Sequence, residues 1–103
     1  MNISTACSSS AVAIGEAYRA IRDGYADVIV TGGSEALLTP GNLAAWDALQ
    51  ALATTDAAHP ERSCKPFSLN RSGLVLGEGA AVLVLETEES AAKRQARVLA
   101  RVT

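Results

Sequence analysis

A chain of 103 residues can form one small domain at most, and a domain of this size has little stability to spare. Apolar residues make up 49% of the sequence and charged residues 19%, which excludes a disordered tail and favours a packed α/β core. The net charge of −2 comes from interspersed acidic and basic side chains, so no basic stripe is available for nucleic acid.

The sequence also lacks the patterns of membrane and metal-binding proteins. No apolar run approaches the roughly 20 residues that span a bilayer, and no basic segment followed by an apolar stretch opens the chain. We therefore expect a cytoplasmic protein. Cys7 and Cys64 show no Cys-x-x-Cys spacing, and His59 is the one histidine, so neither a disulfide framework nor a zinc site is expected.

The first third of the chain predicts a helix and then a strand. Residues 8–23 carry an apolar stripe at helical spacing, and Gly24 is a typical C-terminal stop. The β-branched run in residues 27–31 predicts a strand covered on both faces. We expect Gly32-Gly33 to end this strand.

The middle of the chain predicts a second helix and a long loop. Thr39 and Pro40 are a suitable N-cap and first-turn proline for a helix that continues to about Ala53. Residues 54–73 have little periodicity and contain two prolines. A loop of this length within a compact domain is usually functional or depends on context outside it.

The last third predicts strands and one short helix. Residues 74–76 and 80–86 indicate two strand segments, broken at Gly77-Glu78-Gly79, and Thr87 can cap a following helix. Residues 97–102 alternate as a half-buried strand would.

Strands alternating with helices favour an α/β architecture whose central sheet is mostly parallel or mixed. The apolar runs are too many for these helices to cover, and both ends of the chain lack lead-in elements. We therefore expect a truncated domain whose partner layers come from elsewhere in a longer protein or from a second subunit.

Cys7 is the strongest candidate for chemistry. A cysteine between a short strand and a helix has its thiolate stabilised by free backbone N–H groups and by the helix dipole. The same N–H groups can receive the oxyanion that forms when a thioester carbonyl is attacked. The alternative is a buried structural cysteine, which is the commoner fate of a lone Cys. The position of Cys7 and the composition around it do not decide between a nucleophile and a structural cysteine.

Three segments together resemble the β-ketoacyl-acyl-carrier-protein synthases. They are Thr5-Ala6-Cys7-Ser8-Ser9-Ser10 with its following helix, the strand ending in Gly32-Gly33-Ser34-Glu35, and Lys65-Pro66-Phe67 continuing to Gly73-Leu74-Val75-Leu76-Gly77-Glu78-Gly79-Ala80. They occur in the family's order and cover nearly the whole chain. The resemblance implies that residues 1–103 are part of a ketosynthase domain, from the end of its N-terminal half through the elements that follow Gly77-Glu78-Gly79.

The resemblance further implies a thiolase-like fold with α/β/α/β/α layers and a mixed sheet, usually in a homodimer. Its reaction would load an acyl group from acyl carrier protein or coenzyme A onto Cys7. A malonyl carrier thioester then loses carbon dioxide and its carbanion attacks the acyl-enzyme, in fatty acid or polyketide biosynthesis. No metal or redox cofactor is implied. Two histidines and a phenylalanine amide of the family's site correspond to positions beyond Thr103, so the fragment alone should be inactive.

Other polar and aromatic residues receive secondary roles. His59 lies upstream of the family's histidine positions and is not expected to be catalytic. Trp46 falls where the family carries an aromatic that gates the acyl tunnel, and an ordinary core tryptophan is the alternative. Glu78 is interpreted as a buried carboxylate that holds its loop, and Cys64 as a small packing residue. Ser68 and Ser72 replace aspartates common in the family, which weakens any ionic tie of Arg71.

Three alternatives stay open. Thiolases share the fold and the cysteine nucleophile, although Ser8-Ser9-Ser10 and Gly77-Glu78-Gly79 favour synthases. Chain-length-factor relatives lack the active-site cysteine, so Cys7 argues against them. The last alternative is an inert remnant that contributes only a packing or dimer surface.

Overall fold

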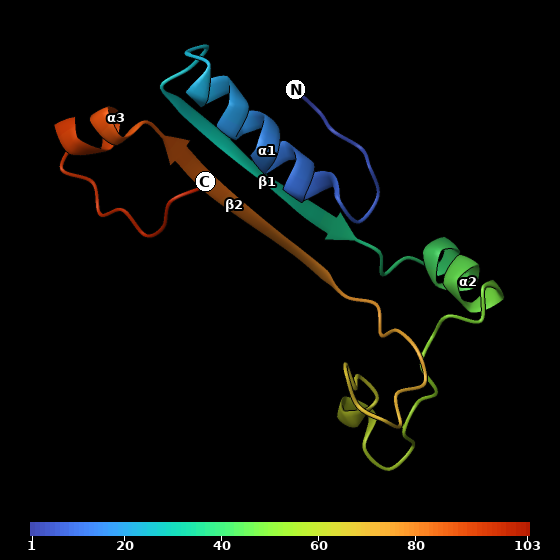
Figure 1. Cartoon of the computed structure of the whole chain (residues 1–103). Coiled ribbons are helices and arrows are strands. Elements are labelled where there is room, and N and C mark those ends of the chain that lie inside the picture. The colour runs from blue at the N-terminus through green and yellow to red at the C-terminus, as the bar shows by residue number, and fades with distance from the viewer. The chain divides into compact units, whose positions relative to one another are not determined.

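The computed structural model describes all residues, 1–103. Its elements in chain order are α1 (Ser9–Arg22), β1 (Val28–Ala36), α2 (Pro40–Ala48), a short 3₁₀ helix (Pro60–Arg62), β2 (Glu78–Glu86) and α3 (Glu88–Lys93) (Figure 1). They form two compact units, one of residues 1–34 with 80–103 and one of residues 35–79. The predicted α/β class is confirmed.

Helix α1 lies within one residue of its predicted bounds at each end. Its C-terminus closes as a Schellman motif, in which Gly24 N–H donates to the Ile21 carbonyl at 3.1 Å and Tyr25 N–H to the Ala20 carbonyl at 2.8 Å. Gly24 has φ +78°, a conformation that glycine adopts without steric cost. The sequence signal at Gly24 is therefore confirmed.

The sheet of this chain consists of β1 and β2, which run in opposite directions (Figure 1). The Thr87 N–H donates to the Asp27 carbonyl at 3.1 Å, which sets residues 27 and 87 opposite each other. The two strands present here are therefore not parallel to each other, and the mixed sheet expected of the whole domain stays a prediction. Alternation of strands and helices predicted crossover connections, but residues 37–77 bring the chain back to pair β2 beside β1 in the antiparallel sense.

Gly32 and Gly33 lie inside β1, so the prediction that they end the strand is wrong. A Cβ at Gly32 would lie 2.1 Å from the Ala81 carbonyl oxygen, and one at Gly33 would lie 2.7 Å from Ser10 Cβ. The two glycines therefore permit close approach of β2 on one side and α1 on the other.

Helix α1 lies on one face of the sheet, against β1, and the other face is open. The Gly33–Ser10 contact places α1 on the face that also carries Ile29 and Thr31. The opposite face carries four valines that are 49–68% exposed: Val28, Val30, Val82 and Val84. The expectation that the first strand is covered on both faces is therefore not met within this chain.

Helix α3 begins at its predicted cap. Thr87 Oγ1 accepts a hydrogen bond from Ser90 N–H at 3.1 Å, and Glu88 and Glu89 occupy the first turn. Residues 97–102 form no strand, because no strand of this chain pairs with them.

Helix α2 has the predicted N-terminus, where Thr39 Oγ1 accepts from Asn42 N–H at 3.4 Å and Pro40 is the first helical residue. It ends at Ala48 and not near Ala53 as predicted. Gln50 has φ +53°, which turns the chain out of the helix. The backbone groups beyond it bond elsewhere, since Ala51 carbonyl accepts from Leu74 N–H and Ala53 N–H donates to Leu74 carbonyl, both at 2.8 Å.

The rest of the second unit is irregular, as predicted for residues 54–73. The predicted strand at 74–76 is reduced to one bridge between Leu52 and Leu74, while β2 begins earlier than expected, at Glu78. Glu78 Oε1 accepts a hydrogen bond from Leu38 N–H at 3.0 Å. This bond joins the two ends of the segment from 38 to 78.

The chain buries very little apolar surface. Ala17 and Ala91 are the only buried apolar residues, and no large side chain is fully buried. No helix in this chain is both long and apolar enough to cross a membrane.

Candidate nucleophile turn at the start of helix α1

The backbone leading into α1 contains one strained residue. Ala6 has φ +53°, in the left-handed region that non-glycine residues seldom occupy. Ser9 Oγ accepts from Thr5 N–H at 2.8 Å and donates to the Ala6 carbonyl at 2.7 Å. Ser8 Oγ donates to the Thr5 carbonyl at 2.8 Å. Two serine hydroxyls thus hold the turn that precedes the helix.

Cys7 follows Ala6 directly and precedes the N-cap residue Ser8. Its thiol is free and exposed, so it is accessible to a reactant. The N–H groups of Ser8 and Ser9 donate to the carbonyls of Thr5 and Ala6, at 3.3 Å and 3.1 Å. The N–H of Cys7 is not part of these bonds. Two of the N–H groups that were expected to be free at this turn are therefore already bonded to carbonyls, and the amide of Cys7 is not one of them.

The start of α1 is fixed against β1 as well as by its own turn. Gly33 lies directly against Ser10, where a methyl group would be 2.7 Å from Ser10 Cβ. Side-chain carbon atoms do not approach that closely, so only glycine lets the first turn of α1 lie at this distance from the strand. The position of Cys7 thus depends on both elements.

The other predicted residues lie in the second unit. The side chain of His59 is exposed, and its Nδ1 is 3.4 Å from Glu61 Oε1. The backbone N–H of His59 donates a hydrogen bond to Asp56 Oδ1. Trp46 is half-buried on α2, a helix without a buried residue. Its two readings, tunnel gate or core residue, stay predictions.

Two interpretations need correction. Glu78 does hold its loop through Leu38 N–H, but it is exposed and not buried. Cys64 is also exposed. The packing residue is its neighbour Ser63, whose buried hydroxyl accepts from Asp56 N–H at 2.9 Å. Arg71 forms no ion pair, and its guanidinium donates to the Ser68 carbonyl at 3.0 Å, in line with the loss of the family's aspartates.

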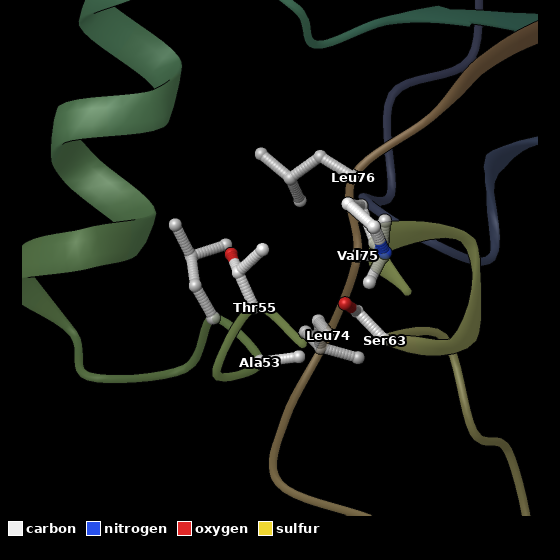
Figure 2. Close-up of a pocket in the computed structure, with 8 residues that line it drawn as sticks. Ala53, Thr55, Ser63, Leu74, Val75 and Leu76 are labelled. Atoms are coloured by element: carbon white, nitrogen blue, oxygen red, sulfur yellow. The ribbon is translucent and has the colours of Figure 1, made fainter. Parts of the chain in front are cut away.

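The second unit has a small hollow of about 230 Å³. Figure 2 shows its lining side chains, which include Ala53, Thr55, Ser63, Leu74, Val75 and Leu76. Ligand sites usually measure roughly 300–1,000 Å³ and place several polar groups around the ligand. This hollow offers little beyond the hydroxyls of Thr55 and Ser63. No cluster of His, Cys, Asp or Glu side chains in the chain could hold a metal ion.

Known proteins are similar to this chain in sequence and in fold. Residues 1–91 match the family model of the β-ketoacyl synthase N-terminal domain. The chain is 43% identical over 98 residues to a 3-oxoacyl-[acyl-carrier-protein] synthase 2 of Staphylococcus aureus, and it covers 95% of itself and 24% of that protein. It is 42% identical to a putative mitochondrial 3-oxoacyl-[acyl-carrier-protein] synthase of Schizosaccharomyces pombe, of which it covers 23%.

Solved structures agree with this result. One is a type II polyketide synthase acyl-carrier protein in complex with its ketosynthase bound to the hexaketide, with a TM-score of 0.90, 40% identity and coverage of 94% of this chain and 24% of that one. A β-ketoacyl synthase from Burkholderia phymatum has a TM-score of 0.77 at 41% identity, over 88% of this chain and 22% of that one. The chain thus spans about a quarter of the length of its relatives. It belongs to the β-ketoacyl synthase family, whose N-terminal domain model it matches over most of its length.

Proposed function

We propose that Cys7 is the acyl-accepting nucleophile of a ketosynthase, and that residues 1–103 are part of such a domain in a longer protein. The observation that carries this proposal is the exposed Cys7 thiol at the start of α1, directly after the strained Ala6, inside the matched region. Strained backbone of this kind is concentrated at functional sites.

The first half-reaction follows from this geometry. The Cys7 sulfur attacks the carbonyl carbon of an acyl thioester, and the new C–S bond replaces the bond to the carrier's sulfur. The carrier leaves as a free thiol and takes up the proton that Cys7 gives up. The amide N–H of Cys7 lies beside its own thiol and is suited to stabilise the oxyanion formed on the way.

The second half-reaction would form the carbon–carbon bond. A malonyl thioester loses carbon dioxide, its carbanion attacks the acyl carbon on Cys7, and the thiol is released with a β-ketoacyl thioester as product. The two histidines and the phenylalanine amide that support these steps in the family would come from residues outside this chain. Acyl carrier protein would bring both thioesters, and the family similarity to a carrier complex supports this partner.

The proposal includes a layered thiolase-like fold, a homodimer and a cytoplasmic location for the longer protein. No metal or redox cofactor is needed for either half-reaction. The other walls of the acyl tunnel belong to residues outside this chain, so fatty acid and polyketide synthesis are both compatible with the proposal.

The test is acylation of the longer protein by a radiolabelled acyl-carrier thioester. We expect label on the unsubstituted protein and none on Cys7→Ala, because this change removes the sulfur that the proposal makes the acyl acceptor. Cys64→Ala is the matched control, since Cys64 is the other exposed free thiol and should not affect labelling. Label that persists in Cys7→Ala, or that disappears in Cys64→Ala, contradicts the proposal.

A further inference from the structure

We infer that the hydroxyl of Ser9 positions the Cys7 thiol for acyl transfer by holding Ala6 in its left-handed conformation. This inference rests on the function proposed above and adds to it a positioning residue that does not itself touch the acyl group.

The hydroxyl of Ser9 bridges the backbone on both sides of the strained residue. It accepts from Thr5 N–H at 2.8 Å and donates to the Ala6 carbonyl at 2.7 Å, which uses its one proton and one of its lone pairs. The two bonds therefore fix the Ser4–Thr5 peptide group relative to the Ala6–Cys7 peptide group. The second of these peptide groups carries Cys7.

Loss of this hydroxyl would release the strain at Ala6. Thr5 N–H has no other acceptor, and Ala6 carbonyl would retain only its bond from Ser9 N–H at 3.1 Å. An alanine with φ +53° is favoured to return to negative φ once its surroundings no longer hold it. That rotation would turn the peptide between Ala6 and Cys7 and redirect the Cβ–Sγ bond of Cys7.

The adjacent serines provide an internal comparison. Ser8 Oγ bonds to Thr5 and does not contact Ala6, with its oxygen 2.8 Å from the Thr5 carbonyl and 3.0 Å from Thr5 Oγ1. Ser10 Oγ makes no hydrogen bond in this chain, and the contact of Ser10 with Gly33 is through Cβ, which alanine retains. Ser10→Ala is therefore a matched control in the same helix turn.

The test compares two reactions of the same thiol in the longer protein. Acyl transfer from a carrier thioester requires an oriented sulfur, whereas alkylation by iodoacetamide requires only an accessible one. A small misplacement of a reacting group lowers a reaction rate by a large factor. We therefore expect Ser9→Ala to lower the single-turnover acylation rate about tenfold or more. The rate of Cys7 alkylation should change by less than about twofold. Ser9→Thr, which restores a hydroxyl, and Ser10→Ala should acylate at the unsubstituted rate.

A second pair of variants tests the route through Ala6. Glycine adopts the left-handed conformation without support, so in an Ala6→Gly background the same Ser9→Ala change should lower acylation by no more than about threefold. This pair also serves if Ser9→Ala alone fails to fold. A loss of about tenfold that persists in the folded double variant overturns the inference.

The remaining outcomes separate this inference from the function on which it rests. Unchanged acylation in Ser9→Ala, or an equal fall in acylation and alkylation, rejects Ser9 as a positioning residue and leaves Cys7 as the acyl acceptor. Failure of the unsubstituted protein to take up acyl label at Cys7 rejects the proposed function itself.

Discussion

Glu86 joins the end of β2 to α3 through a cluster of hydrogen bonds. Its carboxylate accepts from Arg94 Nε at 3.0 Å and from Ser90 Oγ at 3.0 Å, and its side chain is only 12% exposed. The hydrogen bond from Arg94, with a smaller contribution from Ser90, lowers the pKa of Glu86 below its ordinary value of 4.5.

This shift predicts a loss of stability in acid. A carboxyl group whose pKa is lower in the folded state stabilises that state above the unfolded pKa, and the contribution disappears as the pH falls through the folded value. Glu86→Gln should therefore lower the melting temperature of the longer protein above about pH 5, and the difference from the unsubstituted protein should shrink below about pH 4. Melting temperatures recorded across that range provide the measurement.

Glu89→Gln is the control for this prediction. Glu89 pairs with Lys93 at 2.9 Å on the same helix, but both side chains are more than 70% exposed. Solvent-exposed ion pairs contribute little to folding stability, so Glu89→Gln should leave the melting temperature nearly unchanged. A difference between Glu86→Gln and the unsubstituted protein that does not vary with pH would contradict the role given to the Glu86 charge.

The structural roles of some residues could be predicted from the sequence and those of others could not. Cys7, the caps Thr39 and Thr87, and Gly24 have side chains or conformational preferences that mark their positions, and the structure places the caps and Gly24 as predicted. The conformation of Ala6 could not be anticipated, because alanine rarely adopts positive φ and the hydroxyl of Ser9 bonds to the backbone on both sides of it. The cost of about 1–2 kcal/mol for a left-handed alanine is comparable to two hydrogen bonds of about 0.5–1.5 kcal/mol each.

At the scale of elements, the contact between α1 and β1 depends on Gly33. Gly33→Ala would place a methyl group 2.7 Å from Ser10 Cβ, so the first turn of α1 must move away from the strand. Overpacking of this kind costs about 1–3 kcal/mol. We expect a lower free energy of unfolding in urea and slower acylation of Cys7, since the helix start carries the thiol.

Gly41→Ala is the matched change for this prediction. Gly41 lies in the first turn of α2, and a methyl group there meets nothing within 4 Å. Stability should stay constant or rise slightly because alanine favours helix. If Gly33→Ala were as stable and as reactive as Gly41→Ala, the close contact would not be what positions α1.

The existence of the elements was predictable, but their extents were not. Apolar spacing and caps identified all three helices and the two strands. The ends of α2 and β1 depend on contacts far along the chain, with Leu74 for the residues after α2 and with Ala81 for Gly32. The local sequence contains no information on such distant partners. Whether β1 and β2 pair in the parallel or the antiparallel sense also depends on distant partners.

At the scale of the whole molecule, exposed apolar surface is the dominant feature. The four valines on the open face of the sheet are 49–68% exposed, and Phe67 and Leu69 in the second unit are fully exposed. The two buried apolar residues of the chain are alanines, which contribute little to stability. The prediction that covering layers come from outside these residues agrees with this surface.

The isolated 103 residues should therefore not behave as a two-state domain. We expect them to bind the dye ANS and to lose far-UV circular dichroism gradually on heating, whereas the longer protein should unfold in one sharp transition. Calorimetry of both at equal molar concentration provides the measurement. A sharp transition from a monomeric 103-residue chain would show that no covering layer is required.

The bond between Glu78 and Leu38 also bears on how this family can vary. It ties together the two ends of the long segment between β1 and β2, at the first residue of β2. Doubling the length of a flexible loop costs only about 0.6 kcal/mol in closure entropy. We therefore expect a short insertion among the irregular residues 63–73 to cost little in closure entropy and to leave the register of β1 and β2 unchanged, because the bond between Leu38 and Glu78 still closes the segment.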